Sequence, residues 1–173
     1  MKKMNLIIIA FILVLAAIST VLTSCDLFLD GNDGSNGSET SDDPEPGTLT
    51  VNLTNAATAN GHDLWAYVYA DGETDVNTAS TVIATNYAEI VSGAAAFVLE
   101  EDDGSWAPNG TEWTGEAGAS YDVYIYTDVG GDNNPIGDAD AKQTDPMPVL
   151  VTIDGDQLIE VDYLDMVEYT FGE

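Results

Sequence analysis

The feature that most limits how this chain can fold is a period-two alternation of side chains through residues 48–173. It is clearest in 49–53, 64–69 and 121–126. Successive side chains of a β-strand point to opposite faces of a sheet, so the alternation predicts strands. Glycine, asparagine or aspartate separates most of these segments, which favours turns between them. Further strand candidates are 81–85, 87–91, 94–99, 149–153 and 158–163.

About seven or eight short strands in a segment of this length predict an all-β fold, an antiparallel two-sheet sandwich. Residues 48–173 are long enough to bury one core and are expected to form a single domain. A helix over 77–91 is the competing interpretation. The β-branched residues Thr78, Val82 and Ile83 in this stretch favour extended chain instead.

The last two strand candidates predict a hairpin. A three-residue loop, Asp154–Asp156, aligns Val149, Val151 and Ile153 with residues 161, 159 and 157 and keeps one face nearly all apolar. A two-residue turn would mix charged and apolar side chains on that face. Because register follows the buried pattern, we expect the three-residue loop.

The amino terminus has the composition of an export signal. Lys2 and Lys3 precede an uncharged segment, 6–22, that is short for a bilayer span, and small residues then lead to Cys25, the chain's only cysteine. Leu22-Thr23-Ser24-Cys25 resembles the lipobox of bacterial lipoproteins. The resemblance implies cleavage after residue 24 and acylation of Cys25, so that the bilayer becomes a partner of the mature protein. An ordinary secretory signal with a free Cys25 is the alternative.

Residues 25–47 are expected to form a disordered acidic tether after the signal peptide, 1–24. The tether is rich in Asp, Gly, Ser, Asn and Glu, and Pro44 and Pro46 stiffen its end. Asp26 resembles the inner-membrane retention signal of enteric bacteria, whereas acidic residues after the cysteine accompany surface display elsewhere. We expect an extracytoplasmic location, at the outer membrane or cell surface rather than the inner membrane.

Charge excludes one class of partner. The chain has 31 acidic residues and three basic ones, and Lys142 is the only basic residue after the signal peptide. Such a surface repels phosphate, so nucleic-acid binding is excluded. The acidity fits either a solvated surface suited to salt or carboxylates that hold divalent cations.

The segment 121–128, followed by Gly130-Gly131-Asp132-Asn133-Asn134, carries a second resemblance. It is similar to the prealbumin-like (transthyretin-like) or carboxypeptidase-regulatory-like sandwiches of exported bacterial proteins. In these a Tyr-x-Val-x-x-Tyr strand enters a loop rich in aspartate and glycine. The resemblance covers about a third of the domain and implies a fold, not a function.

Catalytic chemistry has little support in the sequence. His62 is the only histidine and follows Asn60-Gly61, where a solvated turn residue is the ordinary interpretation. Without a second histidine or a cysteine it cannot build a zinc site, and no nucleophile elbow or phosphate-binding loop is present. We therefore expect no enzyme. The predicted function is an interaction or structural role in the cell envelope, with a protein or glycan partner.

Tryptophans suggest a glycan-binding module as the alternative function. Trp65, Trp106 and Trp113 could stack on sugar rings if they are exposed. The competing interpretation is that these rings fill the core, because aromatic residues in strands are usually buried.

The segment from Asp128 to Asp140 is a candidate calcium site. Calcium binds six to eight oxygens in flexible geometry. Gly130, Gly131 and Gly137 let the backbone curl, but an EF-hand is excluded because the sixth and twelfth positions from Asp128 are Asn133 and Ala139. An ordinary solvated connection is the alternative. The candidate ligands are Asp128, Asp132, Asn133, Asn134, Asp138 and Asp140.

Overall fold

A computed structural model describes residues 43–169 of the chain. Its strands are β1 (Leu49–Thr54), β2 (Asp63–Ala70), β3 (Ala84–Glu89), β4 (Ala95–Val98), β5 (Glu100–Asp102), β6 (Pro108–Glu112), β7 (Ser120–Asp128), β8 (Lys142–Gln143), β9 (Val149–Thr152), β10 (Gln157–Asp162) and β11 (Val167–Glu168). Two 3-10 turns, Ala57–Ala59 and Ala79–Thr81, complete the regular structure. The predicted signal peptide, Cys25 and most of the predicted tether lie outside the described residues.

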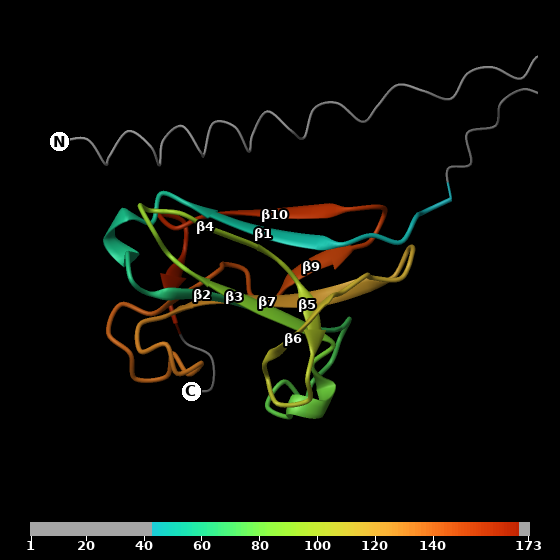
Figure 1. The fold of residues 1–173 in the computed structure, drawn as a ribbon, viewed down its shortest axis with the longest axis horizontal. Helices are drawn as coiled ribbons and strands as arrows, with labels where there is room; N and C mark the ends of the chain where they lie inside the picture. Colours follow the sequence, from blue (N-terminus) through green and yellow to red (C-terminus); the bar gives the residue numbers. More distant parts are fainter. Residues whose placement is uncertain (1–42, 170–173) are drawn as a thin grey trace, which may run out of the picture. The chain divides into compact units, whose positions relative to one another are not determined.

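The strands form two sheets that face each other (Figure 1). The small sheet has the order β10-β1-β4. The large sheet has the order β11-β8-β7-β2-β3-β5-β6, and β9 also pairs with β7. The predicted all-β, two-sheet fold is confirmed. The sheets contain more strands than expected. The additional strands β5, β6, β8 and β11 are two to five residues long, too short to show a clear alternation of apolar and polar residues in the sequence.

The core lies between the sheets and is mainly aliphatic. β1 contributes Leu49, Val51 and Leu53, each 0% exposed, while Thr50 and Asn52 on its other face are half-buried. The large sheet contributes alternate residues of its central strands, Leu64, Ala66 and Val68 from β2 and Val123 and Ile125 from β7. The helical interpretation of 77–91 is wrong in its main part, since β3 runs antiparallel to β2.

The predicted hairpin of residues 149–161 is wrong. β9 pairs with β7 in the large sheet, whereas β10 pairs with β1 in the small sheet, and that pairing is parallel. Val151 therefore lies opposite Tyr121, and Ile159 lies opposite Val51. The loop 154–156 crosses from one sheet to the other, so the sandwich is antiparallel except for β1 and β10.

Contacts with the amino-terminal segment hold this crossing in place. The Asp156 carboxylate accepts hydrogen bonds from the Thr48 amide at 2.9 Å and the Thr48 hydroxyl at 3.0 Å. The Gly155 amide donates to the Glu45 carbonyl at 2.7 Å. A Cβ at Gly47 would lie 1.9 Å from the Gly155 carbonyl oxygen, so only glycine permits this approach. The chain before β1 thus fixes a turn that sequence alone predicts as a free hairpin loop.

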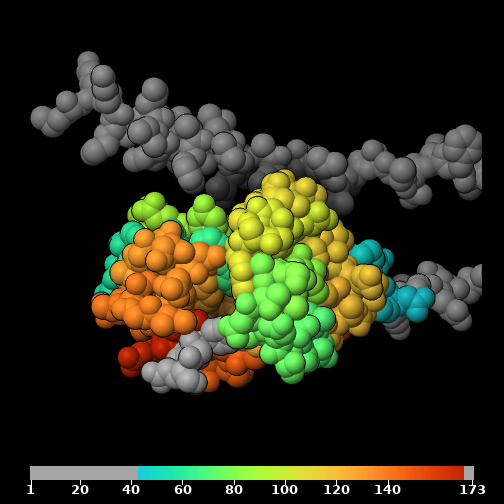
Figure 2. All heavy atoms as spheres, turned by 90° about the horizontal axis from the view of Figure 1, so that it is seen from below, coloured from blue at the N-terminus to red at the C-terminus, as the bar shows by residue number. Residues whose placement is uncertain are grey.

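Loops cover the outer face of the large sheet. Figure 2 looks onto this face and shows the β7–β8 connection in orange, the β2–β3 connection in green and the β5–β6 hairpin in yellow. A second, aromatic cluster lies beneath them and includes Trp65, Tyr67, Tyr69 and Tyr126. Within the described residues no helix has the length and apolar character needed to cross a bilayer.

Candidate functional site

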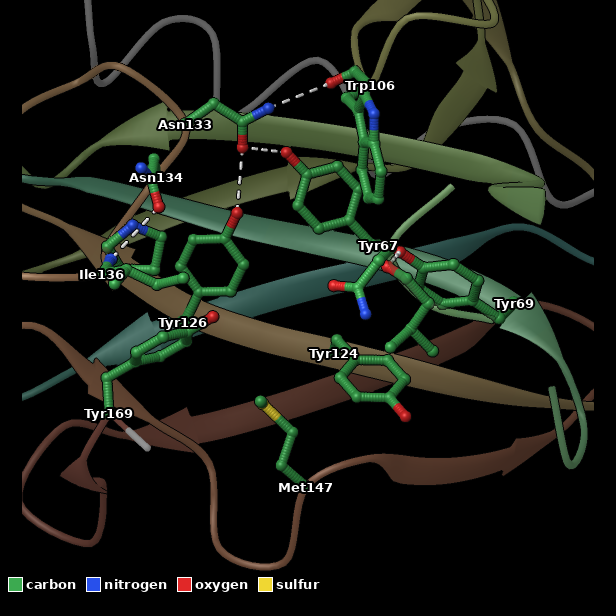
Figure 3. A pocket seen from close by; sticks show the side chains of 13 residues that line it. Tyr67, Tyr69, Trp106, Tyr124, Tyr126, Asn133, Asn134, Ile136, Met147 and Tyr169 are labelled. Carbon is green, nitrogen blue, oxygen red and sulfur yellow. Dashed lines mark hydrogen bonds between the residues drawn. The ribbon is translucent and has the colours of Figure 1, made fainter. Parts of the chain in front are cut away.

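The candidate site is an aromatic pocket on the outer face of the large sheet (Figure 3). Tyr67 and Tyr69 point outward from β2, and Tyr124 and Tyr126 point outward from the neighbouring β7. The alternation that sends aliphatic residues inward sends these tyrosines to the opposite face. Tyr67 and Tyr124 are direct cross-strand partners. Two adjacent strands therefore build an aromatic floor.

The rings of this floor and its walls meet at steep and shallow angles. The Tyr67 ring lies edge-to-face with Trp106 at a centroid distance of 5.6 Å. Tyr69 and Tyr124 meet edge-to-face at 5.3 Å, and Tyr126 and Tyr169 at 5.5 Å. Tyr67 and Tyr126 are stacked at 5.9 Å. In an edge-to-face pair the two ring planes are nearly perpendicular. The aromatic rings that line the pocket therefore have several orientations.

The β2–β3, β5–β6, β7–β8 and β8–β9 connections complete the walls and leave a cavity of about 270 Å³. The β5–β6 hairpin supplies Trp106, the β8–β9 connection supplies Met147, and Tyr169 follows β11. None of the described residues that line the pocket is charged. The rest of the lining is Val76, Asn77, Asn133, Asn134, Pro135 and Ile136.

Asn133 joins the pocket to the β7–β8 connection. Its side-chain oxygen accepts hydrogen bonds from the hydroxyls of Tyr67 and Tyr126, the latter at 2.9 Å. Its side-chain nitrogen donates to the Trp106 carbonyl at 3.4 Å, and its backbone amide donates to Asp128 at 2.6 Å. Asn133 adopts a φ of 62°, which asparagine tolerates better than most residues. The Asn133 side chain thus links both strands of the floor to the β5–β6 hairpin.

Burial keeps the pocket tyrosines neutral. It raises the pKa of Tyr67 to about 12, against an ordinary value of 10.0, while hydrogen bonds with Tyr126 and Asn133 partly oppose the rise. Burial likewise raises the pKa of Tyr169 to about 12, with a smaller contribution from Tyr67. The pKa values of Tyr69 and Tyr126 are raised further, again mainly by burial. Burial therefore moves the ionisation of these tyrosines to more alkaline pH than that of an exposed tyrosine.

Beside the pocket, the predicted calcium loop gathers three carboxylates. Oxygens of Asp128, Asp132 and Asp138 lie within 4.8 Å of one another, so this cluster could hold a metal ion. The three surround Gly130, where a Cβ would meet one oxygen of each at 3.6–3.7 Å. Of the other predicted ligands, Asn134 donates its backbone amide to Asp132 at 3.1 Å, and its side-chain oxygen accepts a hydrogen bond from the Ile136 amide at 3.3 Å. Asp140 is exposed and outside the group of three aspartates.

Asp128 at the end of β7 is the buried member of the cluster, with an exposed fraction of 0%. Its carboxylate accepts hydrogen bonds from the amides of Gly130 at 2.8 Å, Gly131 at 2.9 Å and Asn133 at 2.6 Å. Backbone donors of this kind stabilise a buried negative charge. The loop conformation is thus organised around this carboxylate.

Asp63 is a fourth acid at this end of the sheet, and sequence analysis missed it. It opens β2 and lies opposite Asp128 in the strand register. Burial raises the pKa of Asp63, and the charges of Asp128 and Glu89 raise it further, while His62 opposes them. The strand register places Asp63 beside Asp128, although the two are 65 residues apart in the sequence. No local sequence pattern reveals this register.

The predicted tryptophans occupy three different settings. Trp65 and Trp113 are each 6% exposed, the first in the outer aromatic cluster and the second in the core between the sheets. Tyr87 stacks on Trp65 at a centroid distance of 4.2 Å. Trp106 alone is half-buried and lines the pocket. The structure thus brings together Trp106 and five tyrosines, not the three tryptophans.

The sequence indicates which tyrosines share a strand face, but not which strands are neighbours. Alternation places Tyr67 and Tyr69 on one face, and Tyr124 and Tyr126 on one face of another segment. Without the pairing of β2 with β7, nothing shows that the two faces coincide. The chain matches no protein-family model, no curated protein and no solved structure.

Proposed function

We propose that this chain is a bacterial lipoprotein whose β-sandwich is an interaction module of the cell envelope, with the aromatic pocket as its binding site. Acyl chains on Cys25 anchor the protein on the extracytoplasmic side, at the outer membrane or cell surface. The lipobox-like Leu22-Thr23-Ser24-Cys25 supports the anchor. Two or three acyl chains give stable attachment where a single chain gives only reversible binding.

The pocket is the observation that carries the interaction role. Small-molecule sites are concave, mostly apolar and lined by aromatic groups with a few polar ones. The cavity of about 270 Å³ has this composition and opens on the face that the large sheet turns away from the core.

Ligand-observed NMR on the mature protein tests the binding role. The panel holds neutral saccharides, short peptides and small organic cations. We expect one class to bind, and we expect Trp106→Leu to weaken that binding. Tyr87→Leu is the matched control, because Tyr87 is an aromatic residue of the same sheet, 46% exposed and outside the pocket lining. If no class binds, or Trp106→Leu binds as the parent does, the pocket is not the binding site.

Fractionation of the producing cells tests the anchor. The parent should label with radioactive fatty acid and sediment with membranes, and Cys25→Ser should lose both properties. Digestion by protease added to intact cells supports surface display, whereas protection contradicts it. A Cys25→Ser variant that still sediments with membranes would show that the cysteine is not the anchor.

Glycan binding is the second candidate for the same module. Trp106 supports it, since a half-buried indole beside a hollow is a usual platform for a sugar ring. The burial of Trp65 and Trp113 gives these two residues no part in such a platform. Saturable binding of a neutral saccharide, lost in Trp106→Leu, would select this function.

We also propose calcium as the occupant of the three-aspartate cluster. Hard oxygen ligands and a loop with freedom to adjust suit calcium better than a metal that needs fixed geometry. The carboxylates of Asp128, Asp132 and Asp138 supply the first ligands, and Asp63 adds negative charge beside them. A bound cation would offset the mutual repulsion of these acids.

Calorimetric titration of the metal-free protein tests calcium binding. The variant carries Asp132→Asn and Asp138→Asn, and leaves Asp128 unchanged because its hydrogen bonds hold the loop. Asp140→Asn is the matched control, from the same loop but outside the cluster. We expect saturable heat from the parent and the control and none from the double variant. Equal heats from all three would assign calcium to other carboxylates.

A further inference from the structure

We propose that the aromatic pocket binds a methylated ammonium group, so that its ligand belongs to the small organic cations. This inference rests on the proposed function, because it assumes that the pocket is the binding site. It goes further by naming the ligand's chemistry. Three properties of the pocket carry it: the supply of ring faces, the lack of free hydroxyl donors, and the sign of the surrounding charge.

Aromatic residues are the largest group in the pocket lining. Tyr67, Tyr69, Tyr124, Tyr126, Tyr169 and Trp106 all line it. Edge-to-face pairing in three of their contacts turns neighbouring faces along different directions. A cation near several ring faces is attracted by each ring's quadrupole, and methylated ammonium groups also gain from burial of their methyl surface. The pocket lining thus has the residue composition of an aromatic cage.

The phenol hydroxyls nearest the floor are already committed within the protein. Those of Tyr67 and Tyr126 donate to the Asn133 side chain, and that of Tyr69 donates to the Val76 carbonyl at 3.1 Å. A sugar needs polar partners for its own hydroxyls, since unpaired buried polar groups are costly. A tetraalkylammonium group needs none. The hydrogen bonds of these three tyrosines therefore favour the cation.

The surrounding charge favours a cation as well. The whole chain has a formal charge of −28. Asp102 carries a buried carboxylate oxygen with no hydrogen-bond partner, and its charge acts on both Tyr67 and Tyr69. The Asp128 carboxylate accepts a hydrogen bond from the backbone amide of Asn133, which lines the pocket, at 2.6 Å. Both aspartates are thus near residues of the pocket while lying outside its lining.

The protein supplies no cation of its own to the cage. Lys142 is the only lysine after residue 3, and arginine is absent from the sequence. The Lys142 ammonium lies 4.4 Å from the centroid of the Tyr163 ring, which is outside the pocket lining. The one lysine of the described residues is thus placed on a ring outside the pocket.

Choline and its uncharged isostere, in which carbon replaces the quaternary nitrogen, provide the test. Binding to the unmodified mature protein is measured by tryptophan fluorescence and calorimetry in high salt, which screens diffuse attraction to the acidic surface. We expect choline to bind about tenfold or more tightly than the isostere, as a cation–π interaction in a desolvated site implies. Tetramethylammonium should compete with choline, and potassium at the same concentration should not.

Two substitutions at one position separate ring faces from hydroxyls. Tyr124 lines the pocket, and its edge-to-face contact with Tyr69 belongs to the floor. Tyr124→Phe keeps the ring and should bind choline within about threefold of the parent, whereas Tyr124→Leu should lose about tenfold or more. Tyr87→Leu, outside the lining, should bind as the parent does. Circular dichroism checks that each variant is folded.

The outcomes distinguish this inference from the function on which it rests. Equal affinity for choline and the isostere would overturn the cation assignment and leave an apolar binding pocket. Saccharide binding without choline binding would overturn it in favour of the glycan alternative. Loss of choline binding in Tyr124→Phe would show that the hydroxyl, not the ring, is recognised. If no member of the panel binds at all, the proposed function fails together with the inference.

Discussion

The two faces of the large sheet are buried by different parts of the molecule: the inner face by the small sheet and the outer face by loops. On the inner face, Leu64 and Val68 of β2 are 0% exposed against a second sheet. On the outer face, Trp65, Tyr67 and Tyr69 of the same strand are 6%, 3% and 2% exposed beneath loops. One strand thus carries an aliphatic core on one side and an aromatic cluster on the other.

This difference shows why the site lies where it does. Two sheets can interdigitate closely, so the inner face fills itself with aliphatic side chains. Loops cover the outer face through large rings and side-chain hydrogen bonds, and they leave a hollow of about 270 Å³. Near-equal burial on the two faces therefore goes with different kinds of cover, and the aromatic hollow lies under the loops of the outer face.

The largest effect should follow from a cavity on the inner face. Ile125 of β7 is 0% exposed between the sheets, so Ile125→Ala should lower the free energy of unfolding by about 2–5 kcal/mol in urea denaturation. Leu150→Ala on β9 is the control. Leu150 is 61% exposed, and its loss should change stability by no more than about 0.5 kcal/mol. Equal losses would break the assignment of the core to the inner face.

A smaller effect should follow on the outer face from removing hydroxyls alone. Tyr67→Phe combined with Tyr126→Phe takes both donors from the Asn133 side-chain oxygen and should cost about 1–3 kcal/mol. Either single change leaves one donor, so the double variant should lose more than the sum of the two. A double-mutant cycle in urea measures this coupling. Simple additivity would mean that Asn133 is not the shared acceptor.

Alkaline pH should loosen the outer face selectively. The pKa of Tyr67 and of Tyr169 is about 12 in the folded protein and 10.0 when unperturbed. The folded state therefore keeps protons that the unfolded state releases between these values. Stability from these tyrosines is fully present below pH 10 and declines as pH rises through about 12. Absorbance titration of tyrosinate should show a late-ionising group that urea abolishes. Ionisation of all tyrosines near 10 would contradict their burial.

Salt should give the smallest effect, and it should act through the acidic loops and not through either core. With 31 acidic residues against three basic ones, screening of repulsion should raise the melting temperature modestly as sodium chloride increases. A metal chelator in every sample separates screening from divalent binding. A melting temperature that stays flat or falls with salt would indicate charges that are already compensated.

Local pattern predicted the parts of this molecule that depend on local geometry. Alternation identifies the two faces of β1, β2 and β7, because each strand reveals its own period. The spacing of Asp128, Asp132 and Asp138 along one turn-rich segment was enough to suggest that they converge, as they do. The calcium ion itself stays a prediction.

Features that depend on distant pairing could not be predicted in this way. The pattern of 149–153 fits β10 as well as β7, and only the contacts of 154–156 with Thr48 and Glu45 favour separate sheets. Asp63 joins the acidic end of the sheet through its register with Asp128. The pocket needs both the β2–β7 pairing and Asn133, so its parts are visible in the sequence while its assembly is not.

The central position of β1 in the small sheet has a consequence for the order in which the chain can fold. β1 pairs with β4 and, in parallel, with β10, and the contact of Thr48 with Asp156 spans 108 residues. Contacts of such long range make folding slow, because the chain loses conformational entropy on closing the loop before the contacts can stabilise it. The small sheet cannot be completed until residues 157–162 have been synthesised. A nascent chain with this topology therefore keeps β1 without one of its two partner strands until β10 has emerged.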